Sequence, residues 1–311
     1  MIPNFTINYI NEFITNKVTE TKKILLSHLP ATHRYLTIIA CHADTREKLY
    51  FLRKNIENVS FSNNDIIVIN TSHLSLNAVI QTEIKEKVLK YIEIENTGWL
   101  DFGKWYYVLN EIDHSGYDFI TFTNDSFIIC EPIIYFYYQA SIQNVELFAY
   151  TSSTEVQYHY QSYLFIIQQK AINKFLNYIQ SYLKVPRPNP VLLEINLCNV
   201  FLSKQCFLDI GHFPINFKKN IFFDNTGLYS LLFNSKILPF IKRKRLHNPP
   251  NYYDKLSKCD FSSHSKTSYR GFSNDFKRLF QGVHVCNPAI PCSQNKFSKD
   301  GLNPDIHETL D

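Results

Sequence analysis

The stretch YDFITFTNDSFIICEP, residues 117–132, places an ionisable side chain between two apolar segments. Residues 117–123 are rich in aromatic and β-branched side chains, which predicts a buried strand. Asn124, Asp125 and Ser126 follow, and a second apolar segment begins at Phe127. Asp125 therefore lies either in an Asx-type turn or at the end of a buried strand where it meets a ligand. These residues alone leave both interpretations open.

Similar apolar runs alternate with helical patterns on both sides of this stretch. The expected strands are residues 35–43, 65–72, 91–96 and 117–125. The expected helices are residues 44–59, 76–91, 101–112 and 131–141. Further on we expect a strand at 145–153, a strand running into a helix at 162–183, a loop at 185–190 and a helix at 192–207. This alternation predicts an α/β fold, a mixed, mostly parallel sheet flanked by helices.

Changes in composition divide the chain into three expected parts. Residues 1–30 form an N-terminal helical segment, since apolar residues recur on one side of residues 5–29. Residues 31–248 contain the alternating strands and helices and form the α/β domain. From Pro249 the sequence becomes polar and rich in serine, so residues 249–311 are expected to be a partly irregular C-terminal extension.

Composition and charge limit the classes of protein to consider. The 311 residues are 45% hydrophobic and 19% charged, which is enough apolar material for a sizeable core. A net charge of +4 permits an anionic ligand and does not indicate nucleic acid. No stretch has the pattern of a secretory signal or a transmembrane segment.

The seven cysteines are an odd number without a C-x-x-C pair. They favour free thiols in a reducing compartment, so we expect a cytoplasmic protein. The alternative is a zinc site near the C-terminus, for which the available residues are Cys259, His264, His284, Cys286 and Cys292.

Polar residues follow each of the first expected strands. The four clusters are residues 41–44, 70–72, 96–98 and 124–126. Ligands of parallel sheets bind outside the carboxyl ends of the strands, so clusters that meet at one edge predict a binding site. Asp125 with the neutral oxygen donors Asn124 and Ser126 is compatible with weak Mg²⁺ or Mn²⁺ binding.

A second group of residues lies in ENTGWLDFGKWYYVL, residues 95–109. Asn96 and Gly98 allow a tight turn, and Asp101 can cap the helix that follows. A turn that leads into a helix N-terminus can bind an anion or a ribose. The alternative is a plain turn and cap, in which Trp99 and Trp105 belong to the core.

A third group lies in TSSTEVQYHYQSYLF, residues 151–165. Glu155 and His159 are four residues apart, so on a helical turn they would face the same way, either as a general base with an orienting partner or as a pair that binds an acceptor hydroxyl. A hydrogen-bonded surface turn is the alternative. Glu194 is a lone carboxylate in an apolar helix, either a functional acid or a side chain that faces outward.

In this order, these segments resemble the rhamnan-synthesis F-like glycosyltransferases, a family with a GT-A-type nucleotide-sugar fold. The resemblance covers residues 33–248. The matching segments are TIIACHAD (37–44), ENTGWLDFGKW (95–105), FTNDS (122–126), EVQYHYQSYLF (155–165), LLEINLCNVFL (192–202) and LPFIKRKRL (238–246). The resemblance implies sugar transfer from a nucleotide-diphosphate donor to a hydroxyl of a glycan or glycoconjugate acceptor, commonly in rhamnose-containing polysaccharide biosynthesis.

The resemblance also implies roles for individual residues. The nucleotide would be contacted by Ala40, Cys41, His42 and Thr71. The ribose or the donor sugar would be contacted by Asn96, Gly98 and Asp101. The metal and diphosphate position is Asn124, Asp125 and Ser126, with Lys242 or His247 closing over the diphosphate. The sugars would face Glu155, His159, Gln161 and Ser162. A single Asp125 departs from the fuller Asp-x-Asp triplet of GT-A enzymes.

The expected function is therefore a glycosyltransferase that uses Mn²⁺ or Mg²⁺, with Asp101, Glu155 or His159 as the base if the linkage inverts. A glycosyltransferase-like binding module without turnover is the alternative. A dinucleotide-binding enzyme is disfavoured, because the chain lacks the Gly-rich fingerprint.

Overall fold

The computed structural model describes residues 33–72, 78–95, 100–184, 189–212 and 235–243, and single positions between 12 and 19 and between 220 and 233. The expected N-terminal helix, the C-terminal extension and the alternative zinc residues therefore lie wholly or almost wholly outside the described residues. None of the helices in the described part is long and apolar enough to cross a bilayer.

The first half of the domain is a parallel sheet with intervening helices. Its strands are β1 (Tyr35–Cys41), β2 (Asn64–Asn70), β3 (Lys90–Glu93) and β4 (Phe119–Asn124). The helices between them are α2 (Arg46–Val59), α3 (Ala78–Lys87) and α4 (Leu100–Glu111). The strands pair in the order β3-β2-β1-β4, all in parallel. The predicted alternation of strands and helices is confirmed here.

The second half extends the sheet with both strand directions. Its strands are β6 (Leu147–Ser153), β7 (His159–Tyr160), β8 (Leu164–Gln168) and β9 (Lys204–Leu208). Its helices are α5 (Ile134–Gln143), α6 (Ile172–Leu183) and α7 (Pro190–Leu197), with short 3-10 turns at Gln169–Ala171 and Ile210–His212. β8 is antiparallel to both β4 and β6, whereas β9 is parallel to β6. The sheet is mixed and flanked by helices, as predicted.

One predicted helix, residues 192–207, was wrong beyond Leu197. Helix α7 ends there, and residues 204–208 form strand β9, whose pairing with β6 runs from Leu147↔Lys204 to Thr151↔Leu208. A strand at this position satisfies its backbone groups through β6, a partner that lies far away in the sequence. The apolar run 192–202 continues past the helix end, which is why periodicity alone did not reveal the break.

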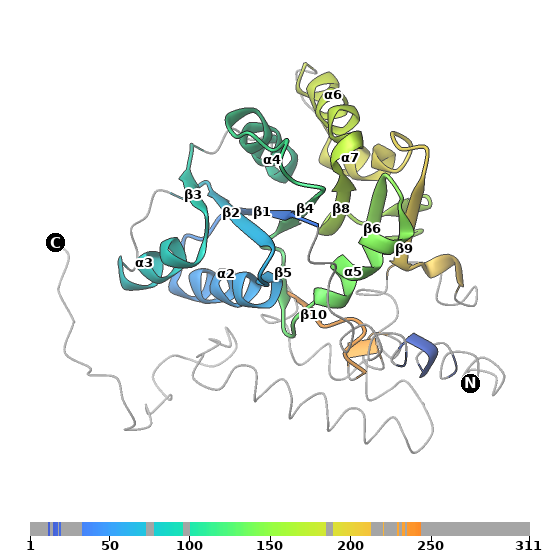
Figure 1. The fold of residues 1–311 in the computed structure, drawn as a ribbon, viewed down its shortest axis with the longest axis horizontal. Helices are drawn as coiled ribbons and strands as arrows, with labels where there is room; N and C mark the ends of the chain where they lie inside the picture. The colour runs from blue at the N-terminus through green and yellow to red at the C-terminus, as the bar shows by residue number, and fades with distance from the viewer. Residues whose placement is uncertain are drawn as a thin grey trace.

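The two faces of the sheet are covered by different helices (Figure 1). Along β1 the side chains alternate between the faces. Ile39 and Cys41 pack with residues of α2 and α5, and Ile38 and Ala40 pack with residues of α4 and α6. Both faces of β1 are therefore buried, and only its ends can contribute to a site.

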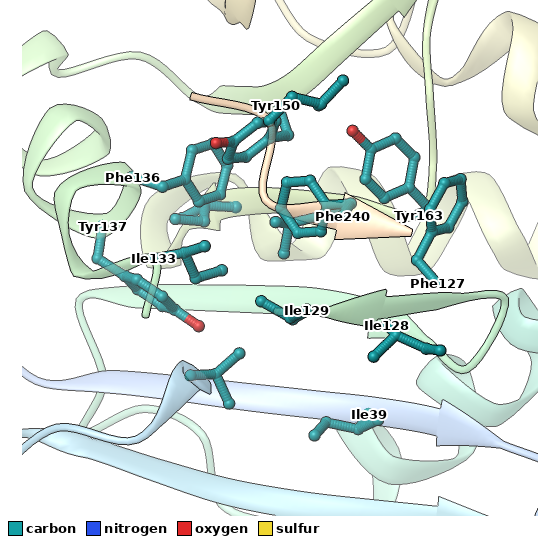
Figure 2. Close-up of a cluster of buried hydrophobic side chains, with 14 of the residues drawn as sticks. Ile39, Phe127, Ile128, Ile129, Ile133, Phe136, Tyr137, Tyr150, Tyr163 and Phe240 are labelled. Atoms are coloured by element: carbon teal, nitrogen blue, oxygen red, sulfur yellow. The ribbon is translucent and has the colours of Figure 1, made fainter. Parts of the chain in front are cut away.

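A two-stranded ribbon lies beside the sheet. Strand β5 (Phe127–Ile129) pairs in antiparallel fashion with β10 (Phe240–Lys242). Figure 2 shows Phe240 between Tyr150 and Tyr163, and the ring centroids are 4.5 and 5.6 Å from that of Phe240. This aromatic packing fixes β10, a segment distant in sequence, next to the residues that follow β4.

Candidate functional site

Three of the four polar clusters meet at the carboxyl edge of the parallel strands. The N–H of Asp125 donates to the carbonyl of Ala40 at 3.1 Å, which joins the end of β4 to the end of β1. The N–H of Thr71 donates to the carbonyl of Cys41 at 3.2 Å, which joins the end of β2 to the same place. The remaining cluster, including Asn96 and Gly98, lies outside the described residues.

Asp125 forms an ion pair at this edge. Nη1 of Arg243 donates to Oδ2 of Asp125 at 2.8 Å and to its main-chain carbonyl at 2.8 Å. The main-chain N–H of His42 donates to the same Oδ2 at 3.2 Å. Only 18% of the Asp125 side chain and 22% of the Arg243 side chain are exposed. Asp125 is therefore a partly buried carboxylate that an arginine neutralises.

Asn124 has its own hydrogen bonds beside this pair. Its Oδ1 accepts from the main-chain N–H of Ser126 at 3.1 Å and from the Ser126 hydroxyl, so residues 124–126 do form an Asx-type turn. Its Nδ2 donates to Oδ2 of Asp101 at 2.9 Å. The turn lies at the end of a buried strand and connects two carboxylates. The turn interpretation is therefore confirmed, and the contact of Asp125 with a ligand stays a prediction.

Asp101 lies in the first turn of α4 and faces the same edge. Burial raises the pKa of Asp101 to about 6; Lys104 and the Asn124 hydrogen bond oppose this shift, and the charges of Asp125 and Glu194 add to it. The side chain keeps 31% of its surface exposed, so it can be reached from solvent. A carboxyl group that titrates near neutral pH can accept a proton during a reaction.

Lys104 is a buried cation that the sequence interpretation missed. Only 7% of the surface of this residue is exposed, and Nζ donates to the carbonyl of Cys41 at 2.9 Å. Nζ also lies 3.8 Å from Oδ1 of Asp101. The spacing Asp101-x-x-Lys104 on one helical face was a usable signal. Lys104 therefore ties α4 to the end of β1 and balances part of the negative charge.

His42 connects the ends of β1 and β2. Its Nδ1 lies 3.1 Å from the Thr71 hydroxyl, and its Nε2 lies 3.4 Å from Oδ2 of Asp44. The side chain is 45% exposed and can contact a ligand. Burial acts to raise the pKa of Asp44, but the hydrogen bond and charge of Lys48 outweigh it and lower the pKa.

Ala40 and Cys41 do not line the site with their side chains, and the nucleotide contacts expected of these two residues stay a prediction. Both are fully buried, because β1 packs against helices on both faces. Burial raises the pKa of the Cys41 thiol well above its ordinary value. Their contribution is through carbonyl oxygens, which accept from Asp125, Thr71 and Lys104.

Glu155 and His159 do not share a helical face, because residues 155–158 form bends and His159 begins strand β7. Oε2 of Glu155 accepts from Asn220 at 3.0 Å, whereas Nδ1 of His159 lies 2.7 Å from the carbonyl of Gln157. The predicted pair of base and orienting partner is therefore wrong. The i,i+4 argument failed because it presupposed a helix.

Gln161, Ser162 and Glu194 belong to a neighbouring group. The main-chain N–H of Ser162 donates to Oε1 of Glu194 at 2.7 Å, so Glu194 does not face outward alone. Oε1 of Gln161 accepts from the buried Thr151 hydroxyl at 2.7 Å. Glu194 is near enough to Asp101 for its charge to raise the pKa of Asp101.

Lys242 and Arg243 are adjacent but differ in surroundings. Nζ of Lys242 lies over the Phe127 ring, 5.3 Å from its centroid. The residue paired with Asp125 is Arg243, which the sequence analysis did not select from the basic run 242–245. His247 lies outside the described residues.

The donor set around Asp125 fits a divalent metal poorly. Hard cations prefer several oxygen ligands, but the Oδ2 oxygen of Asp125 already accepts from Arg243 and His42. Across the described ranges, no three His, Cys, Asp or Glu side chains are grouped so that they could bind a metal ion. A metal at Asp125 stays a prediction.

Comparison with known proteins finds no matching family model and no matching curated protein. Among solved structures, the glycosyltransferase GlyE of Streptococcus pneumoniae TIGR4 is 12% identical, with a TM-score of 0.45 over 80% of this chain and 64% of that chain. TarS 1-349 of S. aureus, solved in complex with UDP, is 8% identical, with a TM-score of 0.40 over 80% and 72%.

A third solved structure is 4-diphosphocytidyl-2C-methyl-D-erythritol synthase of Anaerococcus prevotii DSM 20548. It is 11% identical, with a TM-score of 0.40 over 57% of this chain and 87% of that chain. At identities between 8% and 12%, these similarities concern the arrangement of strands and helices.

Proposed function

We propose that the chain is a glycosyltransferase of the GT-A type, which moves a sugar from a nucleotide-diphosphate donor to a hydroxyl group of a glycan or glycoconjugate. One observation carries the proposal. A carboxyl group with a pKa of about 6, Asp101, is linked through Asn124 to the Asp125–Arg243 pair at the edge where four parallel strands end. That edge is where open α/β sheets bind nucleotides and similar ligands.

The proposed donor lies along this edge. The nucleotide contacts the exposed side chain of His42, which follows β1, and the buried Thr71, which follows β2, supports the His42 ring through a 3.1 Å contact. The diphosphate lies toward the end of β4, where the guanidinium of Arg243 can balance its charge. A donor with two phosphates fits this edge, because the edge combines the exposed side chain of His42 with the guanidinium of Arg243.

The proposed reaction is a single displacement with Asp101 as the base. The acceptor oxygen forms a bond to the anomeric carbon, and the bond from that carbon to the diphosphate oxygen breaks. The leaving nucleoside diphosphate takes the electron pair, and the acceptor proton moves to the carboxylate of Asp101. Oδ2 of Asp101 accepts from Asn124, and within the described part of the chain Oδ1 accepts no hydrogen bond.

Asp101 is a better base than the other two predicted residues. The Oε2 oxygen of Glu155 accepts from Asn220, and Nδ1 of His159 is in hydrogen-bond contact with the carbonyl of Gln157. Neither residue is connected to Asp125 by the hydrogen bonds of the described chain. We propose that both lie on the acceptor side. Transfer of rhamnose, or to a rhamnose-containing glycan, is an expectation from the sequence resemblance.

Calorimetric titration tests the proposed function. UDP, GDP, CDP, ADP and dTDP, and then their sugar conjugates, are titrated with Mn²⁺ and with EDTA. The proposal predicts that one nucleotide binds and that its sugar conjugate is slowly hydrolysed. Absence of binding by every nucleotide under both conditions would contradict it.

A second function, a binding module without turnover, is supported by the pairing of Asp125 with Arg243. A carboxylate held this way is less available for a metal that assists the leaving group. Binding of a sugar nucleotide without any hydrolysis or transfer, in the presence of a range of acceptor glycans, would favour this module over the enzyme.

A further inference from the structure

We propose that Arg243, positioned by Asp125, binds the donor diphosphate through its remaining N–H donors, so that the chain binds a nucleoside diphosphate without a divalent metal. This inference rests on the proposed function, and it assigns to a protein side chain the diphosphate contact that the sequence led us to expect from Mn²⁺ or Mg²⁺.

The ribbon of β5 and β10 brings Arg243 to the edge. Its last pair is Lys242↔Phe127, and the N–H of Arg243 then donates to the carbonyl of Ser126 at 2.9 Å. The buried Phe240, packed between Tyr150 and Tyr163, anchors the ribbon (Figure 2). The position of Arg243 therefore depends on the core and not on a surface contact.

Asp125 orients the guanidinium and leaves part of it available. Nη1 makes both hydrogen bonds to Asp125, at 2.8 Å each. Within the described residues, Nε and Nη2 of Arg243 donate to no acceptor, and 22% of the side chain is exposed. A guanidinium has five N–H donors in a fixed plane, so one edge can bind a carboxylate while another binds phosphate oxygens.

The charges at this edge favour an arginine over a metal. Asp125 contributes one negative charge, and Arg243 compensates it. A metal ion at the same carboxylate would have to displace the guanidinium or lie beside it, which adds repulsion between two cations at short distance. A phosphate group instead adds negative charge next to a cation that already has donors to spare.

The test compares variants in the presence of EDTA and of Mn²⁺. The probes are UDP, GDP, CDP, ADP and dTDP, each with its nucleoside monophosphate. Arg243→Gln removes the charge, and Arg243→Lys keeps a charge without the planar fork. Arg53→Gln is the matched control, because Arg53 also pairs with a carboxylate at 2.8 Å, that of Glu83, and is 28% exposed, but lies within α2. Thermal unfolding shows whether each variant is folded.

We expect the wild-type chain to bind one diphosphate in EDTA, with less than about a threefold gain from Mn²⁺. Arg243→Gln should weaken diphosphate binding at least about tenfold and reduce the preference for diphosphate over monophosphate. Arg243→Lys should be intermediate, and Arg53→Gln should match the wild type.

Two results would overturn the inference. If the diphosphate binds only with Mn²⁺ and neither Arg243 variant changes its affinity, a metal supplies the charge, and the inference fails while the proposed function stands. If no nucleotide binds the wild-type chain in EDTA or in Mn²⁺, both fail. Should Arg243→Gln unfold, the folded Arg243→Lys variant and the metal dependence of the wild type still decide between these outcomes.

Discussion

Replacing Asp101 with asparagine should stabilise the protein and inactivate it. Asparagine has nearly the same shape but cannot ionise, so it imitates the protonated acid. Because burial raises the pKa of Asp101 from 3.8 to about 6, the protonated form is more favoured in the folded chain than in the unfolded chain. A shift of this size corresponds to roughly 3 kcal/mol. Since 31% of the side chain is exposed, solvent screens part of it, and we expect about 2 kcal/mol.

The gain in free energy of unfolding of Asp101→Asn over the wild type should increase as pH rises. Below about pH 4 the acid is protonated in both the folded and the unfolded chain, and the stability difference between Asp101→Asn and the wild type is smallest. Between about pH 4 and 6 the unfolded chain releases the proton first, so the free energy of unfolding of the wild type falls as pH rises. Above about pH 7 the full difference is present. Urea denaturation of both proteins from pH 4 to 7.5 measures it.

Asp44→Asn is the control for this experiment. The pKa of Asp44 is lowered, because the hydrogen bond and charge of Lys48 outweigh the effect of burial. Its contribution to stability is therefore present throughout this pH range and is lost only at lower pH. We expect Asp44→Asn to be less stable by about 0.5 kcal/mol at every pH tested. If the stability difference between Asp101→Asn and wild type is equal at pH 4 and pH 7.5, the pKa of Asp101 is not raised in the folded chain.

The turnover of Asp101→Asn should fall by about a hundredfold or more with donor affinity little changed, because the base is lost and the diphosphate contacts remain. The wild-type rate should rise with pH with a midpoint near 6, the pKa of Asp101. A variant with wild-type turnover would remove Asp101 from the proposed role.

Three further substitutions follow from the same contacts. Lys104→Met should raise the pKa of Asp101 further, because Lys104 lowers it, and the midpoint of the pH–rate profile should move upward; an unmoved midpoint contradicts this. Trp105→Ala should lower the free energy of unfolding by about 3–5 kcal/mol in urea, because the fully buried ring leaves a cavity; a loss below about 1 kcal/mol would show that the core had been misjudged. Asp125→Ala should reduce turnover at least about tenfold, because Arg243 loses the carboxylate acceptor and keeps only the main-chain carbonyl of residue 125; an unchanged rate removes Asp125 from the site.

Local patterns predicted the first half of the fold well. The runs 35–43 and 65–72 contain enough β-branched residues to be recognised as strands, and the structure places strands at Tyr35–Cys41 and Asn64–Asn70. The direction of later strands could not be read in this way. Strand β8 pairs with β4 in antiparallel fashion. This direction depends on which strand β8 pairs with, and the residues of β8 alone do not predict it.

The candidate site was predictable only in part. Asp125 and Asn124 could be found because they interrupt two apolar runs, and Asp101 because it begins a helix after a turn. Arg243 could not be chosen from the basic run 242–245, because the register of β10 against β5 decides which cation meets Asp125. The pairing of Glu155 with His159 failed for a similar reason, since spacing along the chain predicts proximity only within a known element.

A crystal structure of the chain with the nucleoside diphosphate that binds in calorimetry tests the proposed site most directly. We expect phosphate oxygens at about 3 Å from the guanidinium of Arg243, with the nucleotide toward His42 and Thr71 and with Asp101 facing the sugar position. A nucleotide bound away from the carboxyl edge of β1 and β4, or a metal on Asp125 with Arg243 displaced, would contradict it.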